Sequence, residues 1–134
     1  MPARVLVVDD TVPNVKLLEA QLQTEKYEVF TAFGGQEALD KLEPCGAQIV
    51  LLDVMMPGMD GYEVCRRIRQ NPRTAGLPVV MVTALDKASD REAGMAAGAD
   101  DYLVKPVVLG VLFPLMRRLL ERRAPAPAPS AKAS

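Results

Sequence analysis

Histidine is absent from the chain, and cysteine occurs only twice in its 134 residues. The missing histidine excludes Ser-His-Asp and Cys-His catalysis, metal sites built on imidazole, and a role as phosphohistidine carrier. Two cysteines are too few for a disulfide framework or a four-thiolate zinc site, so we expect a reducing compartment. No apolar run reaches the ~20 residues that a membrane-spanning helix needs, and no signal-peptide pattern is present. The sequence therefore predicts a cytoplasmic protein without a membrane partner.

A strong net charge is also missing, since 16 Lys and Arg residues face 17 Asp and Glu residues, for a formal charge of −1. A near-neutral chain has no global field that would attract nucleic acid. A basic cluster near the end of the last predicted helix complements the helix dipole and has no interleaved aromatic residues. Its members are Arg117, Arg118, Arg122 and Arg123. We therefore expect no nucleic-acid partner.

The composition, 49% apolar and 25% charged, is that of an ordinary globular domain. We expect one domain over residues 1–123, because this length suits a single hydrophobic core. From residue 124 the chain becomes rich in Ala and Pro, which bury almost nothing. Residues 124–134 are therefore expected to form a flexible tail or linker.

Short β-rich runs alternate with helical patterns along the chain, which predicts an α/β fold with a parallel sheet covered by helices on both faces. The strands are expected at 5–8, 27–32, 49–52, 79–82 and 102–104, and the helices at 14–25, 36–43, 62–70, 86–97 and about 112–123. Pro13 suits a first helical turn. The last helix is expected to begin near Leu112, with Pro114 in its first turn, because an interior proline would cost about 3 kcal/mol.

Polar residues stand where the predicted strands end. Asp9 and Asp10 end the first strand and Asp53 the third, while Thr83 ends the fourth and Lys105 the fifth. The carboxyl ends of parallel strands share one edge, where ligands bind at the point of reversed strand order. The second strand ends without such a residue, which favours the doubly wound order 2-1-3-4-5. That order brings the three aspartates together.

Three carboxylates in one crevice repel each other unless a cation lies between them. All-oxygen ligands without His or Cys select a hard metal, Mg²⁺ or Mn²⁺. Lys105 adds a positive charge and Thr83 a hydroxyl donor. Because phosphoryl transfer needs mainly positioning and charge neutralisation, this set predicts an aspartyl-phosphate site. Taken alone, the acidic pair Asp9 and Asp10 would fit a simple turn at a helix start equally well.

Four stretches carry a family resemblance: VLVVDD at 5–10, LLDVMMPGMDGYEVCRRIR at 51–69, PVVMVTALD at 78–86 and GADDYLVKP at 98–106. With them the chain resembles the receiver domains of two-component response regulators, the CheY-like family, and is most similar to receivers of PleD-type diguanylate cyclase regulators. The resemblance implies a flavodoxin-like fold of five parallel strands and five helices. It also implies a signalling switch, not an enzyme, that catalyses only its own phosphorylation and dephosphorylation.

The resemblance also implies residue roles. Asp53 is expected to accept the phosphoryl group, and Asp9 and Asp10 to hold the metal together with Asp53 and the main-chain carbonyl of Met55. Thr83 is expected to hydrogen-bond the phosphoryl group, and Lys105 to pair with it.

Three further expectations concern the surroundings of that site. The small Ala84 leaves room for the phosphoryl group, and the bond between Lys105 and Pro106 is cis. Tyr102 matches the family's switch aromatic, which turns inward as Thr83 moves toward the phosphate, although a half-buried strand tyrosine would also fit the pattern.

The expected partners are a histidine kinase or phosphotransfer protein as phosphodonor, or a small phosphodonor, and a downstream protein or a second copy of the chain. The apolar run Val107-Val108-Leu109 departs from the polar helix start that the family usually has at this place. It predicts an interface on the face of the fourth helix, fifth strand and fifth helix. Alternative functions are a receiver cut from a larger diguanylate cyclase-type regulator, a phosphorylation-independent docking module, and an aspartyl-phosphate phosphatase. The phosphatase motif needs an Asp where Met55 stands.

Overall fold

The computed structural model describes residues 2–123, with Arg123 described for its backbone only. Residues 124–134, the predicted tail, lie outside the described residues. The strands are β1 (Arg4–Val8), β2 (Glu28–Ala32), β3 (Ile49–Leu52), β4 (Val79–Thr83) and β5 (Asp101–Val104). The helices are α1 (Val12–Gln23), α2 (Gly35–Lys41), α3 (Gly61–Gln70), α4 (Ala88–Ala96) and α5 (Leu109–Arg123).

The five strands form one parallel sheet in the order β2-β1-β3-β4-β5, which confirms the predicted α/β topology. Val8 at the end of β1 lies opposite Ala32 of β2 and Leu52 of β3. The strands therefore end nearly level, so the residues that follow them meet at one edge. Strands β3 and β4 are buried throughout, whereas β2 buries only Ala32, as expected of a strand at the border of the sheet.

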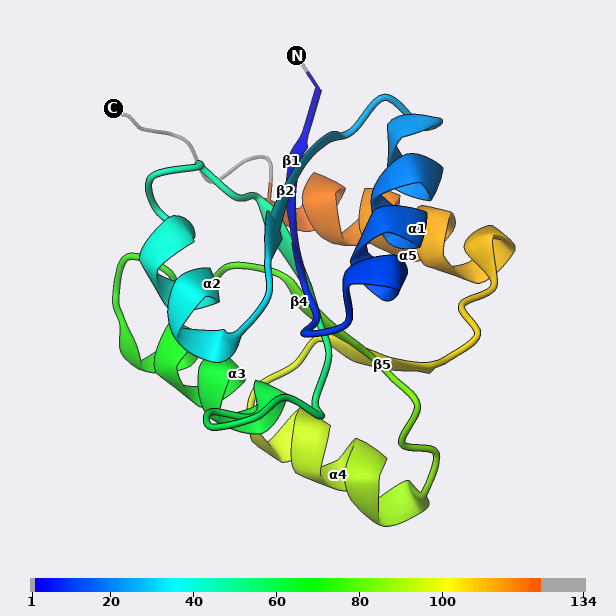
Figure 1. The fold of residues 1–134 in the computed structure, drawn as a ribbon. Helices are drawn as coiled ribbons and strands as arrows, with labels where there is room; N and C mark the ends of the chain where they lie inside the picture. Colours follow the sequence, from blue (N-terminus) through cyan, green and yellow to red (C-terminus); the bar gives the residue numbers. More distant parts are fainter. Residues whose placement is uncertain (1, 124–134) are drawn as a thin grey trace.

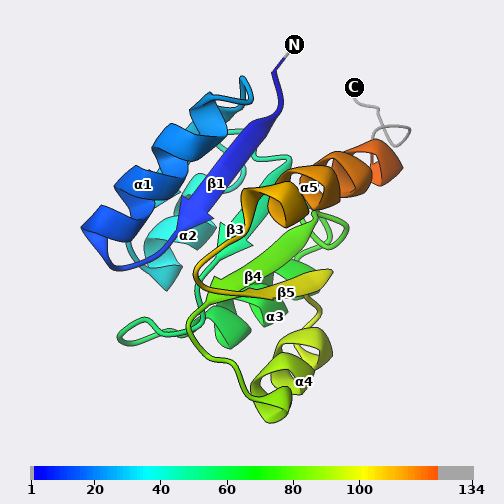
Figure 2. The ribbon, with the colours of Figure 1, turned by 90° about the vertical axis from the view of Figure 1, so that its right-hand side faces the viewer.

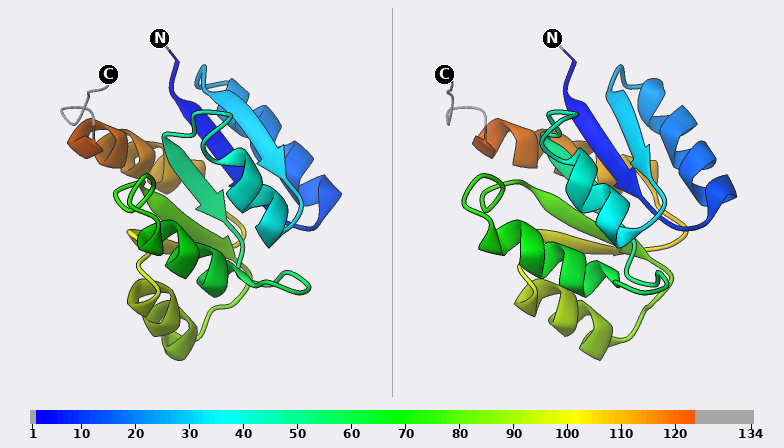
Figure 3. Two further views of the ribbon diagram at one scale, coloured as in Figure 1. Left: turned by 90° about the vertical axis from the view of Figure 1, so that its left-hand side faces the viewer. Right: turned by 60° about the vertical axis from the view of Figure 1, so that its left-hand side comes forward.

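Helices cover both faces of the sheet, which is the doubly wound arrangement (Figure 1). Helices α1 and α5 lie on one face (Figure 2), and α2, α3 and α4 lie on the other (Figure 3). Each face has its own apolar cluster: Leu22 and Leu112 belong to the first, Val64 and Ile68 to the second. Within residues 2–123, no helix has both the length and the apolar character to cross a membrane.

Local signals account for where the helices begin and end. Pro13 lies in the first turn of α1, where no amide hydrogen is needed. The Asp60 carboxylate caps α3 by accepting a hydrogen bond from the Glu63 amide at 2.9 Å. Gly98 follows α4 with φ 109°, a left-handed conformation that glycine adopts without strain.

The predicted start of the last helix is wrong. Helix α5 begins at Leu109, three residues before the expected position, and Pro114 lies inside it. The Val108 carbonyl accepts hydrogen bonds from the amides of Val111 and Leu112, which establishes the early first turn. Pro114 has no amide hydrogen, so the Gly110 carbonyl lacks its usual partner in the helix. Both residues are exposed, and water can donate a hydrogen bond to that carbonyl instead. The side chains that α5 buries offset the remaining cost of the proline: Leu112, Leu115, Met116 and Leu119.

The apolar segment before α5 is only partly covered. Val107 and Leu109 pack against the cluster under α1 and α5. Val108 remains 63% exposed, and Val104 on β5 and Val111 on α5 are 42% and 53% exposed. These three exposed valines belong to β5, to the segment after it and to the first turn of α5, and the predicted interface there stays a prediction.

Candidate functional site

The aspartates expected at the site follow two neighbouring strands. The Asp9 amide donates to the Ala32 carbonyl at 3.2 Å, and the Asp53 amide to the Val8 carbonyl at 2.9 Å, so both residues continue the sheet ladder past the strand ends. Asp9 and Asp53 are buried, with 5% and 7% of their surface exposed, whereas Asp10 is exposed. Two acids are thus held at the edge of the core and a third faces solvent.

The three carboxylates converge. Asp9, Asp10 and Asp53 each offer an oxygen, and these oxygens lie within 4.8 Å of one another. Such a set of hard oxygen donors fits Mg²⁺, which binds one or two carboxylates and keeps several waters. The amide of Met55 donates to Asp53 Oδ1 at 3.4 Å. The role of the Met55 carbonyl as a ligand stays a prediction.

Lys105 follows β5, the border strand two places from β3, and contacts both buried acids. Its Nζ lies 2.7 Å from Asp9 Oδ2 and 3.4 Å from Asp53 Oδ2, and its amide donates to the Thr83 carbonyl at 2.8 Å. Burial favours the neutral amine, but the two carboxylates outweigh it and raise the pKa of Lys105 above its ordinary value. The ammonium is therefore charged at neutral pH. The following bond to Pro106 is cis, as the resemblance implies.

Asp9 has two further partners. The Thr11 amide donates to Asp9 Oδ1 at 2.9 Å, and Asn14 Nδ2 lies 3.4 Å from Asp9 Oδ2. Asn14 was not among the predicted site residues. The signal for it in the sequence is its position in the first turn of the helix that follows the acidic pair. In that position the side-chain amide can reach back to Asp9.

The last residue of β4 and the loop after it carry two further residues that were expected near the phosphoryl group, Thr83 and Ala84. Thr83 is fully buried, and its Oγ1 accepts a hydrogen bond from the Leu85 amide at 3.4 Å. Ala84 between them is exposed. Tyr102 on β5 is only 3% exposed, and its hydroxyl donates to the Leu85 carbonyl at 3.0 Å. The tyrosine therefore lies inward, against the loop that follows Thr83.

Gly61 is a second residue that sequence reasoning missed. It opens α3, and its amide donates to the Val54 carbonyl at 2.9 Å. A Cβ at this position would overlap the carbonyl oxygen of Asp53 and come within 2.8 Å of the Val54 Cα. Only glycine lets the start of α3 approach the backbone at Asp53 so closely.

A cavity of about 410 Å³ opens beside the carboxylates. Asp9, Asp53 and Lys105 form its polar end, and Leu17, Leu18 and Val107 contribute apolar walls. The space admits a small charged group to Asp53 from the side of α1. An arrangement of converging carboxylates, a half-buried ammonium and a buried hydroxyl can hold a dianionic group on an aspartate.

Comparison with known proteins gives a consistent result. The family model of the response regulator receiver domain matches residues 5–117. Response regulator PleD of Caulobacter vibrioides (strain NA1000 / CB15N) is 51% identical over 119 residues, which make up 89% of this chain and 26% of PleD. Response regulator MprA of Mycobacterium sp. (strain KMS) is 45% identical over 133 residues, 99% of this chain and 57% of MprA. The chain thus spans about a quarter of the one relative and just over half of the other.

A solved structure with a similar fold is that of the Vibrio cholerae chemotaxis protein CheY4. It has a TM-score of 0.82 at 33% identity, and the similarity covers 89% of this chain and 99% of that chain.

Proposed function

The chain belongs to the family of response regulator receiver domains, and from this premise we propose that Asp53 accepts a phosphoryl group in the presence of Mg²⁺. The observation that carries the proposal is the convergence of Asp9, Asp10 and Asp53, with Lys105 Nζ hydrogen-bonded to two of them. Receiver domains are signalling switches of two-component systems, so the phosphoryl group serves to change how this protein binds a partner.

The chemistry requires little from the chain beyond positioning. An oxygen of Asp53 forms a bond to phosphorus, while the bond from phosphorus to the donor's nitrogen or oxygen breaks and its electron pair leaves with the donor. Lys105 exchanges part of its contact with Asp9 for a phosphoryl oxygen, and the Thr83 hydroxyl donates to another. Asp9, Asp10 and Asp53 would hold a Mg²⁺ ion, which would supply neutralisation of the negative charge at this site.

The switch follows from contacts that exist only with the phosphoryl group present. A ligand shifts a two-state equilibrium only by its differential interaction with the two states. Contacts from Thr83 and Lys105 to the phosphoryl group supply that difference. Two hydrogen bonds extend this effect toward β5: the Leu85 amide donates to Thr83 Oγ1, and the Tyr102 hydroxyl donates to the Leu85 carbonyl.

These 134 residues include no histidine that could form a phosphohistidine, so the group that donates the phosphoryl group lies outside them. We infer a histidine kinase or a phosphotransfer protein, with a small acyl phosphate as a substitute. The receiving partner is a downstream protein or a second copy of this chain on the face formed by α4, β5 and α5. Exposed Val104, Val108 and Val111 support that placement, since apolar surface of this kind favours association.

A cytoplasmic site of action belongs to the same proposal. The cysteines Cys45 and Cys65 are free thiols, which fits a reducing compartment.

Binding of beryllium fluoride, which mimics a phosphoryl group on a carboxylate, tests the proposal. With Mg²⁺ and beryllium fluoride present, the melting temperature of the wild-type protein should rise, because a ligand that binds only the folded state stabilises it. The variant Asp53→Asn should show no rise. The matched control Asp60→Asn, which changes the same functional group but keeps a good helix cap, should respond like the wild type. An equal rise in Asp53→Asn would contradict the assignment.

A further inference from the structure

Helix α4 packs against Tyr102 through a position that has no side chain. Gly94 is the one residue that α4 buries. A Cβ built on it would lie 2.8 Å from Tyr102 Cδ2 and 3.2 Å from Tyr102 Cε2, with Met81 Cγ at 3.6 Å behind. Contacts between carbon atoms normally begin near 3.5 Å. A methyl group at residue 94 and the ring of Tyr102 in its present place are therefore incompatible.

The buried ring position matters because of what the Tyr102 hydroxyl holds. It donates to the Leu85 carbonyl at 3.0 Å, and the Leu85 amide in turn donates to Thr83 Oγ1. The loop between β4 and α4 is thus anchored to β5 through one side chain. If the ring leaves, the Leu85 carbonyl loses that donor, and the loop after Thr83 loses its hydrogen bond to this side chain of β5.

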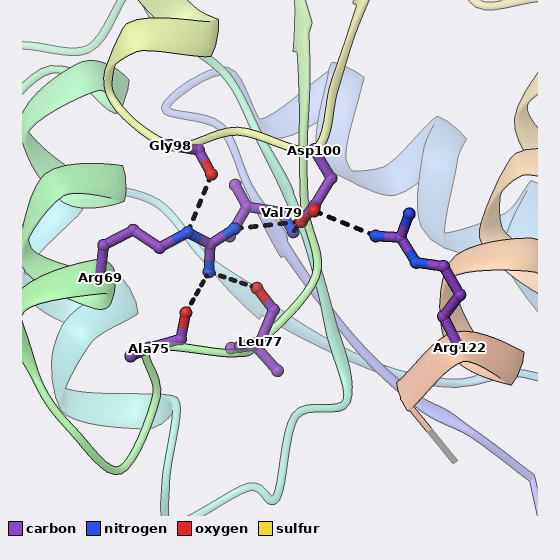
Figure 4. A network of polar contacts seen from close by, with 7 residues as sticks. All are labelled: Arg69, Ala75, Leu77, Val79, Gly98, Asp100 and Arg122. Atoms are coloured by element: carbon purple, nitrogen blue, oxygen red, sulfur yellow. Dashed lines mark hydrogen bonds and ion pairs between the residues drawn. The ribbon is translucent and has the colours of Figure 1, made fainter. Parts of the chain in front are cut away.

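Helix α4 is not free to move away from a larger side chain. Near its start, the Tyr62 hydroxyl of α3 donates to the Asp90 carbonyl at 3.0 Å. Just after its end, Arg69 Nε donates to the Gly98 carbonyl at 2.8 Å, and the same guanidinium pairs with Asp100 at 3.0 Å (Figure 4). The helix is therefore tied to α3 at both ends.

A third contact ties the helix to β5 itself. Arg91 Nη1 donates to the Tyr102 carbonyl at 2.9 Å, and Arg91 Nη2 pairs with Asp101 at 3.2 Å. The backbone of Tyr102 is thereby held beside α4. With both backbones held, the ring is the component that has to yield.

We propose that Gly94 is a positioning residue of the switch, whose missing side chain keeps open the buried place of the Tyr102 ring. This inference rests on the proposed function in one respect only, the effect on phosphoryl binding at Asp53. The size of residue 94 then sets the fraction of molecules with Tyr102 inward, and through Leu85 and Thr83 it sets the apparent affinity of the site for a phosphoryl group.

The first test measures the position of the ring. The chain has three tyrosines, so incorporation of 3-fluorotyrosine gives three ¹⁹F resonances that Tyr→Phe variants assign. In the wild-type protein the Tyr102 resonance should be shielded from solvent, and in Gly94→Ala it should become sensitive to solvent exchange between H₂O and D₂O. The matched control is Gly110→Ala, also in a helix, where a Cβ meets nothing within 4 Å. It should leave the resonance unchanged.

The second test measures the consequence for the site. If the inward state falls to about one tenth of the population, the apparent affinity for beryllium fluoride with Mg²⁺ should fall about tenfold. Gly110→Ala should bind as the wild type does. Wild-type protein that fails to bind beryllium fluoride would refute the proposed function, while the ¹⁹F readout would still decide where the ring lies.

A double variant keeps the inference falsifiable if Gly94→Ala folds poorly. In a Tyr102→Ala background the clash is absent, so adding Gly94→Ala should raise the melting temperature, since alanine favours a helix over glycine. A melting temperature lowered equally in both backgrounds would overturn the inference. So would a Tyr102 resonance that stays shielded in folded Gly94→Ala.

Discussion

At the scale of single residues, Lys105 explains how two buried acids share one crevice. Its ammonium contacts Asp9 at 2.7 Å and Asp53 at 3.4 Å, which offsets the repulsion between the carboxylates. Removal of that charge while both acids stay buried would leave them uncompensated. Lys105 is thus a structural counter-ion in this state and, in the proposed function, the group that pairs with the phosphoryl oxygens.

Gly61 gives the first prediction at this scale. The variant Gly61→Ala should lower the free energy of unfolding by about 1–3 kcal/mol, because the added methyl overlaps the Asp53 carbonyl and forces the backbone apart. Urea denaturation measures the change. Gly76→Ala is the control, since a Cβ there meets nothing within 4 Å and it should stay near the wild type. Equal stability of Gly61→Ala and Gly76→Ala would show that the close approach is not required.

Most of the candidate site could be predicted because its side chains immediately follow strands. Asp9, Asp53 and Lys105 are predicted from their places at the ends of strands, and their carboxylate and ammonium groups do meet. Gly61 and Gly94 could not be found in this way. Each glycine is required because a helix packs closely against a backbone or an aromatic ring. A single sequence does not reveal such a packing distance.

At the scale of elements, burial explains which ones the sequence revealed. Strands buried on both faces, such as β3 and β4, are uniformly apolar and were easy to recognise. The start of α5 was not predicted, because Gly110 and Pro114 both disfavour a helix at this place. The apolar residues that α5 buries, Leu112 among them, outweigh these local preferences. Tertiary packing of this kind overrides propensity.

Helix α4 should be the least protected helix in hydrogen exchange. It buries only Gly94, whereas α3 buries Val64, Cys65 and Ile68. Since local opening costs less where few apolar contacts are lost, we expect the free energy of opening to be at least about 1 kcal/mol lower in α4 than in α3. The hydrogen bonds that tie α4 at its ends fix its place when it is formed and do not replace a buried face. Equal protection of both helices would contradict this expectation.

At the scale of the whole molecule, the exposed valines of β5 and of the start of α5 are candidates for a contact with a second copy of the chain or another protein. Val104 belongs to the border strand β5, and Val108 and Val111 lie just before and within the first turn of α5. The chain spans about a quarter of PleD and just over half of MprA, both longer proteins. The alternative that this receiver works within a larger diguanylate cyclase-type regulator therefore stays a prediction alongside the homodimer.

Sedimentation velocity tests the homodimer. With Mg²⁺ and beryllium fluoride, the wild-type protein should associate at lower concentration than without them, because activation favours the binding state. Val108→Asp should weaken the association by placing a charge in the apolar contact. Phe33→Asp, at the end of the border strand β2 on the other side of the sheet, is the matched control and should associate normally. A monomer at every concentration, with and without beryllium fluoride, would exclude this interface.

The most direct test of the central claim is to locate the phosphoryl group after incubation with acetyl phosphate and Mg²⁺. Mass spectrometry of the intact protein should show the addition of one phosphoryl group, and peptide mapping should assign it to Asp53. Chelation of Mg²⁺ by EDTA should prevent the addition, as should Asp53→Asn. A phosphoryl group found on another residue, or an undiminished addition to Asp53→Asn, would contradict the account.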